Sequence, residues 1–282
     1  MFKIGLSTCG SFVTEELFAK YQKAGIEFME ISVAADKYAL LDYAGMSALS
    51  KNYGVKIWSY HLPFGPFYVL DISKRELSRG SIAYLAELIK KGAAIGIDKF
   101  VIHPSGEPIP DGERAERMRI SCESLCALAD IAKKEGAVIA VEDLPRTCLG
   151  NCSDEIEMLI KDHADLRVCF DTNHLLFEDP VHFIKALGER IITVHVSDFD
   201  FVNERHWLPG EGKVDWNALI AALAAAGYKG PWLYEIGFGC PNTIIREREL
   251  TCEDFTENAK ALFEGRTPPV LSKPKPNLGL WG

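Results

Sequence analysis

The sequence lacks three features, each of which would have assigned it to a class of protein. It has no run of about 18 apolar residues, the length that a membrane-spanning helix needs, so we expect no membrane partner. It has no basic segment followed by an apolar stretch and a cleavage site near Met1, so we expect a cytoplasmic protein. Its eight cysteines form no Cys-x-x-Cys pair, and we expect them to be reduced thiols.

Positive charge is also scarce. Lys and Arg number 31 against 40 Asp and Glu, which gives a net charge of -9 at pH 7. A general nucleic-acid-binding surface needs a basic stripe that neutralises phosphates, so we expect no nucleic-acid partner. Hydrophobic residues make up 48% of the 282 residues and the mean hydropathy is near zero, which is typical of a soluble globular protein with a large core.

Apolar strand-like runs alternate with helical patterns along the chain. We expect strands at residues 3–7, 27–31, 55–60, 99–102, 138–141, 166–170, 191–194 and 232–234. We expect helices at residues 14–24, 46–52, 74–92, 113–135, 154–163, 180–188, 216–226 and 252–263. Repeated units of this kind form parallel sheets, and eight of them predict a closed (β/α)8 TIM barrel.

An open, doubly wound sheet is the alternative fold. It usually has a glycine-rich phosphate-binding turn after its first strand. The corresponding turn here, residues 7–11, reads Ser-Thr-Cys-Gly-Ser and has no Gly-x-Gly-x-x-Gly pattern, which favours the barrel. We expect one catalytic barrel domain over residues 1–264. A proline-rich extended tail is expected over residues 265–282, because this stretch has few helix-forming residues.

Four successive strands end on residues that bind metals. The runs that end near residues 141, 170, 194 and 234 are followed by Glu142, Asp171, His195 and Glu235. The carboxyl ends of barrel strands form the active-site face, so these side chains should converge. Three converging carboxylates repel one another, and one divalent cation is the simplest compensation. Mn²⁺, Mg²⁺, Co²⁺ and Zn²⁺ all suit such ligands.

Further histidines gather at the same predicted face. His61 and His103 end the third and fourth strands, and His174 follows Asp171. Each could bind metal or substrate, or simply make a structural hydrogen bond. The loop over residues 197–216 is long enough to suggest a function, and its Arg205 and His206 could donate hydrogen bonds to a substrate. The alternative is a solvated charged turn.

These motifs resemble those of the xylose isomerase-like TIM-barrel superfamily, which holds sugar isomerases and epimerases, inosose dehydratase-type enzymes and endonuclease IV. The resemblance extends from Ile4 to about Phe263. The motifs that carry it are Val-Glu-Asp at 141–143, Phe-Asp-Thr-Asn-His at 170–174, Val-His-Val-Ser-Asp at 194–198, Arg-His-Trp-Leu-Pro-Gly-Glu-Gly at 205–212 and Tyr-Glu-Ile at 234–236.

The resemblance implies a metal-dependent sugar isomerase or epimerase. In that reading one divalent ion is bound by Glu142, Asp171, His195 and Glu235, and the substrate is a ketose or a related polyol-ketone. Glu142 and Glu235 are the catalytic pair, which moves a proton through a metal-stabilised enediolate. Departure of a hydroxyl from the same enediolate would give a dehydratase. The residues implied in substrate binding are His61, His103, His174, Arg205 and His206.

The endonuclease IV branch is the main rival. It implies a trinuclear zinc site acting on abasic DNA, and the additional ligands would be His61, His103, His174, Glu204 and His206. Glu204 departs from the aspartate of that branch, and the acidic net charge also disfavours it. A barrel that only binds a ligand and a homo-oligomeric assembly are both left open by the sequence.

Overall fold

The computed structural model describes residues 1–65, 70–276 and 278. Its main sheet contains β1 (Ile4–Ser7), β2 (Phe28–Ile31), β3 (Lys56–His61), β4 (Lys99–Ile102), β5 (Val138–Glu142), β6 (Arg167–Asp171), β7 (Ile191–His195) and β8 (Trp232–Tyr234). The α-helices are α1 (Glu15–Ala24), α2 (Tyr43–Tyr53), α3 (Arg75–Ala94), α4 (Asp111–Lys134), α5 (Ser153–Ile160), α6 (Pro180–Leu187), α7 (Trp216–Ala225) and α8 (Cys252–Phe263). The described residues also form the short 3₁₀ helices η1 (Ala35–Leu40) and η3 (Gly188–Arg190).

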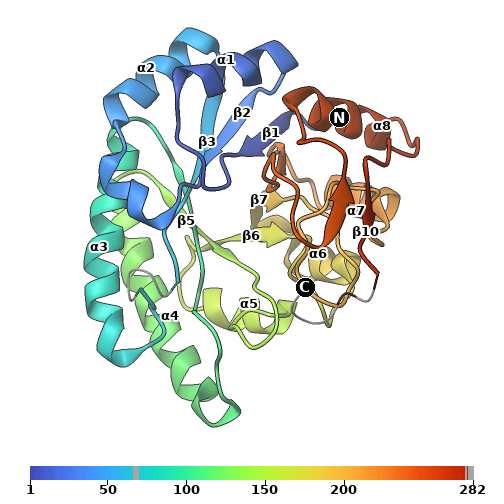
Figure 1. Cartoon of the computed structure of the whole chain (residues 1–282). Coiled ribbons are helices and arrows are strands. Elements are labelled where there is room, and N and C mark those ends of the chain that lie inside the picture. Colours follow the sequence, from blue (N-terminus) through green and yellow to red (C-terminus); the bar gives the residue numbers. More distant parts are fainter. Residues whose placement is uncertain (66–69, 277, 279–282) are drawn as a thin grey trace.

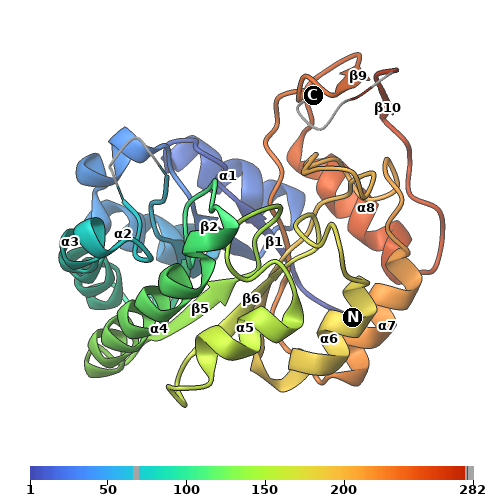
Figure 2. The ribbon, with the colours of Figure 1, turned by 90° about the horizontal axis from the view of Figure 1, so that it is seen from below.

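The eight strands form a parallel barrel in the order β7-β6-β5-β4-β3-β2-β1-β8, with the helices outside it (Figures 1 and 2). The barrel closes between β7 and β8, where Val196 N donates to Leu233 O at 2.8 Å and Glu235 N donates to Val196 O at 3.2 Å. The predicted (β/α)8 TIM barrel is therefore confirmed, and the open sheet is excluded. Within the described residues, no helix is long and apolar enough to cross a membrane.

Helix boundaries follow local capping chemistry. The Thr14 side chain accepts a hydrogen bond from Leu17 N at 3.2 Å and begins α1, and Gly25 ends it with φ of 77°. The helix expected at 46–52 starts earlier, at Tyr43, because Asp42 caps it by accepting from Gly45 N at 2.9 Å. A cap of this kind sets the start of a helix even where the apolar periodicity has not yet begun.

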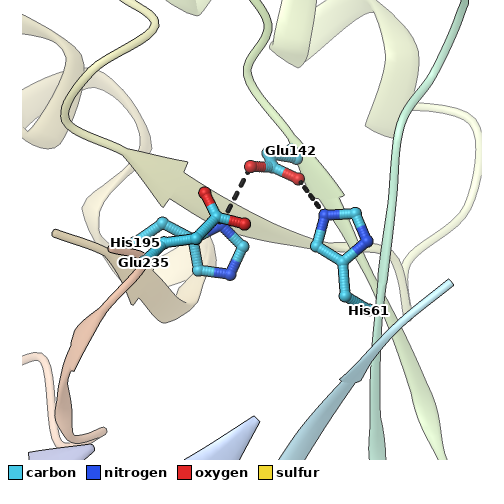
Figure 3. A group of neighbouring side chains, drawn as sticks. All are labelled: His61, Glu142, His195 and Glu235. Atoms are coloured by element: carbon cyan, nitrogen blue, oxygen red, sulfur yellow. Dashed lines mark hydrogen bonds and ion pairs between the residues drawn. The ribbon is translucent and has the colours of Figure 1, made fainter. Parts of the chain in front are cut away.

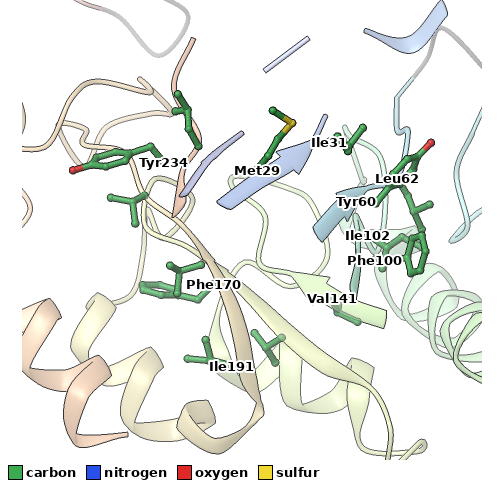
Figure 4. Close-up of a cluster of buried hydrophobic side chains, with 14 of the residues drawn as sticks. Met29, Ile31, Tyr60, Leu62, Phe100, Ile102, Val141, Phe170, Ile191 and Tyr234 are labelled. Atoms are coloured by element: carbon green, nitrogen blue, oxygen red, sulfur yellow. The ribbon is translucent and has the colours of Figure 1, made fainter. Parts of the chain in front are cut away.

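The core lies inside the barrel and between the strands and the outer helices. Figure 4 shows part of it, with Phe100, Phe170 and Tyr234 from three different strands. Parallel strands are buried on both faces, which explains their nearly continuous apolar runs. Helix α3 approaches β4 closely at Gly92, where an added Cβ would lie 2.8 Å from the Phe100 ring.

The tail returns to the barrel. Its short strand β10 (Ser272–Pro274) pairs antiparallel with β9 (Ile244–Arg246), which belongs to the loop after β8. Lys275 N also donates to Thr243 O at 2.9 Å. The described part of the tail therefore supports the loop that begins at Glu235. The division into residues 1–264 and 265–282 stays a proposal.

Candidate metal centre

The ends of four strands bring the four predicted ligands together. Strands β5, β6 and β7 end on Glu142, Asp171 and His195, and Glu235 follows β8 directly. Asp171 pairs in register with His195. Figure 3 shows Glu142, His195 and Glu235 pointing toward one another from different strands, with His61 beside Glu142.

Their separations are short. The Nδ1 atom of His195 lies 2.9 Å from Glu142 Oε1, 3.5 Å from Glu235 Oε2 and 3.8 Å from Asp171 Oδ2. One ligand atom from each of His61, Glu142, His195 and Glu235 lies within 4.8 Å of the others. Asp171 falls in another group of this kind, with Glu142 and His174, so Glu142 joins the two groups.

The burial of these groups fits a bound divalent cation. Glu142, Asp171 and His195 have no exposed surface. Among the described residues, Asp171 Oδ2 has no hydrogen-bond partner, although Asp171 Oδ1 accepts from Asn173 N at 2.6 Å. A buried carboxylate oxygen without a partner costs several kcal/mol unless a cation compensates it. The donor set is therefore suited to a hard or borderline divalent ion.

Glu30 belongs to this centre and was missed by the sequence analysis. This fully buried residue of β2 lies with its Oε2 atom 3.0 Å from His195 Nε2, and it accepts a hydrogen bond from Ser59 Oγ at 2.8 Å. A carboxylate on the outer nitrogen orients a histidine ligand and leaves the other nitrogen for the metal. Glu30 escaped notice because Ile31, not Glu30, ends the strand. A lone carboxylate between Met29 and Ile31 was the available signal.

Two carboxylates of the centre have opposite pKa shifts. Burial would raise the pKa of Glu142, but the imidazoles of His195, His103 and His61 hold it well below its usual range. Burial raises the pKa of Glu235, and the nearby His195 lowers it. The negative charges of Glu142 and Asp171 raise it further, so that the pKa of Glu235 is about 7. In the metal-free protein, Glu142 is therefore ionised while Glu235 exchanges a proton near neutral pH.

His61 and His103 both contact Glu142. Their Nε2 atoms lie 3.0 and 3.2 Å from Glu142 Oε2, and His61 Nδ1 lies 2.9 Å from Leu62 O. The Phe64 ring stacks on His103 with ring centroids 3.8 Å apart. These two histidines thus lie beside Glu142, and their roles in substrate or additional metal binding stay predictions.

A second group contains His174, Glu204 and His206. Glu204 Oε1 lies 3.3 Å from His174 Nε2 and 3.6 Å from His206 Nε2. His174 Nδ1 lies 3.5 Å from Asp171 Oδ2, so this group adjoins the first one. The other oxygen of Glu204 forms an ion pair with Arg146, a residue that the sequence analysis did not select.

Arg205 lies apart from these groups. Its side chain is buried, and its Nε donates to Asp200 Oδ2 at 2.9 Å. Its backbone N donates to Asn173 Oδ1 at 2.9 Å, which ties the loop after β7 to the loop after β6. This connection holds the neighbouring His206 in place, whereas the Arg205 side chain does not line the cavity described next.

A cavity of about 390 Å³ opens beside the centre. Its polar wall includes Lys74, His103, Glu107, Arg146, His174 and Glu204. Its apolar wall includes Phe64, Leu70, Leu77, Leu144 and Pro145. A mixed wall of this kind, next to candidate metal ligands, is typical of a small-molecule site.

The barrel and this site define a TIM-barrel protein with a candidate metal centre at the carboxyl ends of its strands. The family model described as xylose isomerase-like TIM barrel matches residues 18–250. The chain therefore belongs to the xylose isomerase-like TIM-barrel family.

The curated relatives that match the chain have names with different functions. Endonuclease 4 of Thermus thermophilus is 31% identical over 146 residues, which cover 46% of this chain and 50% of that protein. Inosose dehydratase of Geobacillus thermodenitrificans is 28% identical over 141 residues, which cover 43% of this chain and 47% of that protein. The chain thus spans about half the length of these curated relatives.

Solved structures match over more of the chain. A D-tagatose 3-epimerase-like protein superposes with a TM-score of 0.80 at 20% identity, covering 93% of this chain and 97% of that one. An identity this low shows the shared fold alone.

Proposed function

We propose that the protein is a divalent-metal-dependent isomerase or epimerase of sugars or related polyol-ketones. The observation that supports this function is the convergence of Glu142, Asp171 and Glu235 on His195 Nδ1. A divalent cation held by these four residues would supply Lewis acidity that favours negative charge developing on substrate oxygens.

The two glutamates with opposite pKa shifts are the proposed proton carriers. Ionised Glu142 accepts the proton from the carbon beside the substrate carbonyl. Glu235, on the β8 side, returns a proton to the substrate. After one turnover Glu142 is protonated and Glu235 is ionised, so the two residues exchange roles in the reverse direction or solvent resets them.

The histidines around the cavity would position the substrate. His103 and His174 line the cavity. His61 contacts Glu142, and His206 contacts Glu204. Imidazole nitrogens can donate or accept a hydrogen bond to a substrate hydroxyl. Phe64 would pack against a C–H face of the substrate, because its ring is half exposed at the cavity.

The direct test is proton exchange. The Mn²⁺- or Co²⁺-loaded protein is incubated with a panel of ketoses and inososes in deuterated water, and deuterium at the carbon beside the carbonyl is measured by NMR. We expect exchange with at least one substrate. Glu142→Gln and Glu235→Gln should each slow it by about 10²–10⁴-fold, whereas the exposed, surface-paired Glu87→Gln should not. Unchanged exchange in either site variant would refute the assignment.

An endonuclease IV-like phosphodiesterase is the second candidate. It is favoured by the His174, Glu204 and His206 group, which adjoins the first centre and could hold a further ion. Cleavage of a synthetic duplex with one abasic site, with no exchange on any ketose, would select this function. Formation of a dehydrated product from an inosose would instead select the dehydratase.

A further inference from the structure

A guanidinium stands beside the second group of candidate ligands. Arg146 Nη1 forms an ion pair with Glu204 Oε2 and also donates to Asn203 Oδ1 at 2.7 Å. The same Glu204 carboxylate uses Oε1 to contact His174 and His206. The one carboxylate of this group is therefore already neutralised by a cation that belongs to the chain.

Three loops fix the guanidinium in this place. Arg146 lies on the loop after β5 with φ of 55°, and its backbone O accepts from Asn151 Nδ2 at 2.9 Å. On its other side, Arg146 Nε donates to both oxygens of Glu107, from the loop after β4, at 3.0 and 3.1 Å. Glu204 comes from the loop after β7. A planar, permanently charged group held by carboxylates on two sides is a fixed feature of the cavity wall.

The first centre differs in its charge. Within the described residues, the carboxylates of Glu142, Asp171 and Glu235 have only histidines as ion-pair partners. Three carboxylates there face no Lys or Arg, whereas the second group has one carboxylate and one Arg. A divalent ion is therefore attracted less strongly to the second group than to the first, because Arg146 faces Glu204 there, although its charge is balanced further out by Glu107.

We propose that Arg146 is the permanent cation of the second group and keeps a metal ion out of it. His174, Glu204 and His206 then remain free to make hydrogen bonds to substrate oxygens in the cavity. This last part rests on the proposed isomerase or epimerase function, because a phosphodiesterase with three ions would need one of them in this group.

The test counts metal ions instead of turnover. Wild type, Arg146→Asn and Lys74→Asn are saturated with Zn²⁺, dialysed, and analysed for zinc per chain, and crystals of each are examined for anomalous scattering at the zinc edge. Asn is chosen because it tolerates the positive φ at residue 146. Lys74→Asn is the matched control, because this substitution removes a positive charge from the wall of the same cavity at a residue that has no ion pair with Glu204.

We expect Arg146→Asn to bind one zinc ion per chain more than wild type, with the additional peak between His174, Glu204 and His206. Lys74→Asn should have the wild-type count, and so should Arg146→Lys, which keeps the charge. A wild-type ion at these three residues overturns the proposal, as does an Arg146→Asn protein, folded by circular dichroism, with the wild-type count. Neither result depends on activity, so a failure to find isomerase turnover counts against the proposed function alone.

Discussion

A residue that contacts a candidate metal ligand from behind can matter as much as the ligand itself. His195 is a clear example, because Glu142 contacts one ring nitrogen and Glu30 contacts the other. The outer carboxylate sets which nitrogen faces the metal. Glu30 is therefore expected to control metal affinity without being a ligand.

Glu30→Gln should weaken Mn²⁺ or Zn²⁺ binding by about 10–100-fold, because an amide orients the imidazole less strongly and does not increase its basicity. Isothermal titration calorimetry measures the change. Glu27→Gln, one residue before β2 and paired with Lys3 on the surface, is the control and should bind like wild type. Equal affinities of wild type and Glu30→Gln would assign Glu30 a purely structural role.

Metal binding should also depend on pH, because a ligand must lose its proton before it binds an ion. In the metal-free protein the pKa of Glu235 is raised to about 7. Burial lowers the pKa of His195, but Cys169, Glu235, Glu30 and Glu142 together outweigh burial and hold it well above its ordinary value. Below pH 7 both groups carry protons that the ion must displace.

The metal dissociation constant should therefore fall as pH rises from 6 to 8, by roughly tenfold per pH unit for each proton displaced. Calorimetry in two buffers of different ionisation enthalpy counts the released protons. A dissociation constant that does not change over this range would show that the ligands are already deprotonated without metal.

Sequence alone identified the residues that follow a simple positional rule. Glu142, Asp171 and His195 end barrel strands, and the carboxyl ends of parallel strands must meet. Glu30 does not end its strand, and Arg146 acts through a loop with positive φ whose path no periodicity specifies. Residues of this second kind become visible only when three-dimensional contacts are known.

At the level of elements, the strands were predictable because burial on both faces leaves long apolar runs. The helix ends were less so. Helix α5 ends at Ile160, before the expected end near residue 163. There the chain forms a turn in which His163 N donates a hydrogen bond to Ile160 O at 3.4 Å. The His163 ring also accepts a hydrogen bond from Asp165 N at 3.2 Å, and apolar periodicity does not reveal a turn of this kind.

The contact between α3 and β4 gives a prediction of stability. Gly92→Ala should lower the free energy of unfolding by about 1–3 kcal/mol, because the new methyl group would lie 2.8 Å from Phe100 Cε1 in a packed core. Urea denaturation followed by circular dichroism measures the change.

Gly80→Ala is the matched control in the same helix, where an added Cβ meets nothing within 4 Å. There the better helix propensity of Ala should raise stability by about 0.5–1 kcal/mol. If both variants changed stability equally, the close approach at Gly92 would carry no packing cost.

For the whole molecule, the centre joins elements from both halves of the chain, since Glu30 lies on β2 and the ligands on β5 to β8. An ion that binds only the folded state stabilises all of it. At a free metal concentration 100 times the dissociation constant, we expect the free energy of unfolding to rise by about 2.7 kcal/mol. The Tm should then be roughly 5–10 °C higher than that of the protein freed of metal by a chelator.

Differential scanning fluorimetry with EDTA and with added Mn²⁺ tests this expectation. Asp171→Asn is the control, because it removes one ligand charge and should lose most of the metal-dependent rise. A Tm that is the same with and without metal in wild type would show that the four residues hold no ion at these concentrations.

The closure of the barrel has a consequence for biosynthesis. Strand β8 pairs with β1 at the start of the chain, and Glu235 follows β8. A ribosome releases β1 long before β8, so a nascent polypeptide has an incomplete set of candidate ligands until residue 235 has left the exit tunnel. For the proposed metal-dependent enzyme, loading of the cation would therefore be a late event, and truncated translation products would be unable to compete for the cell's metal supply through these four residues.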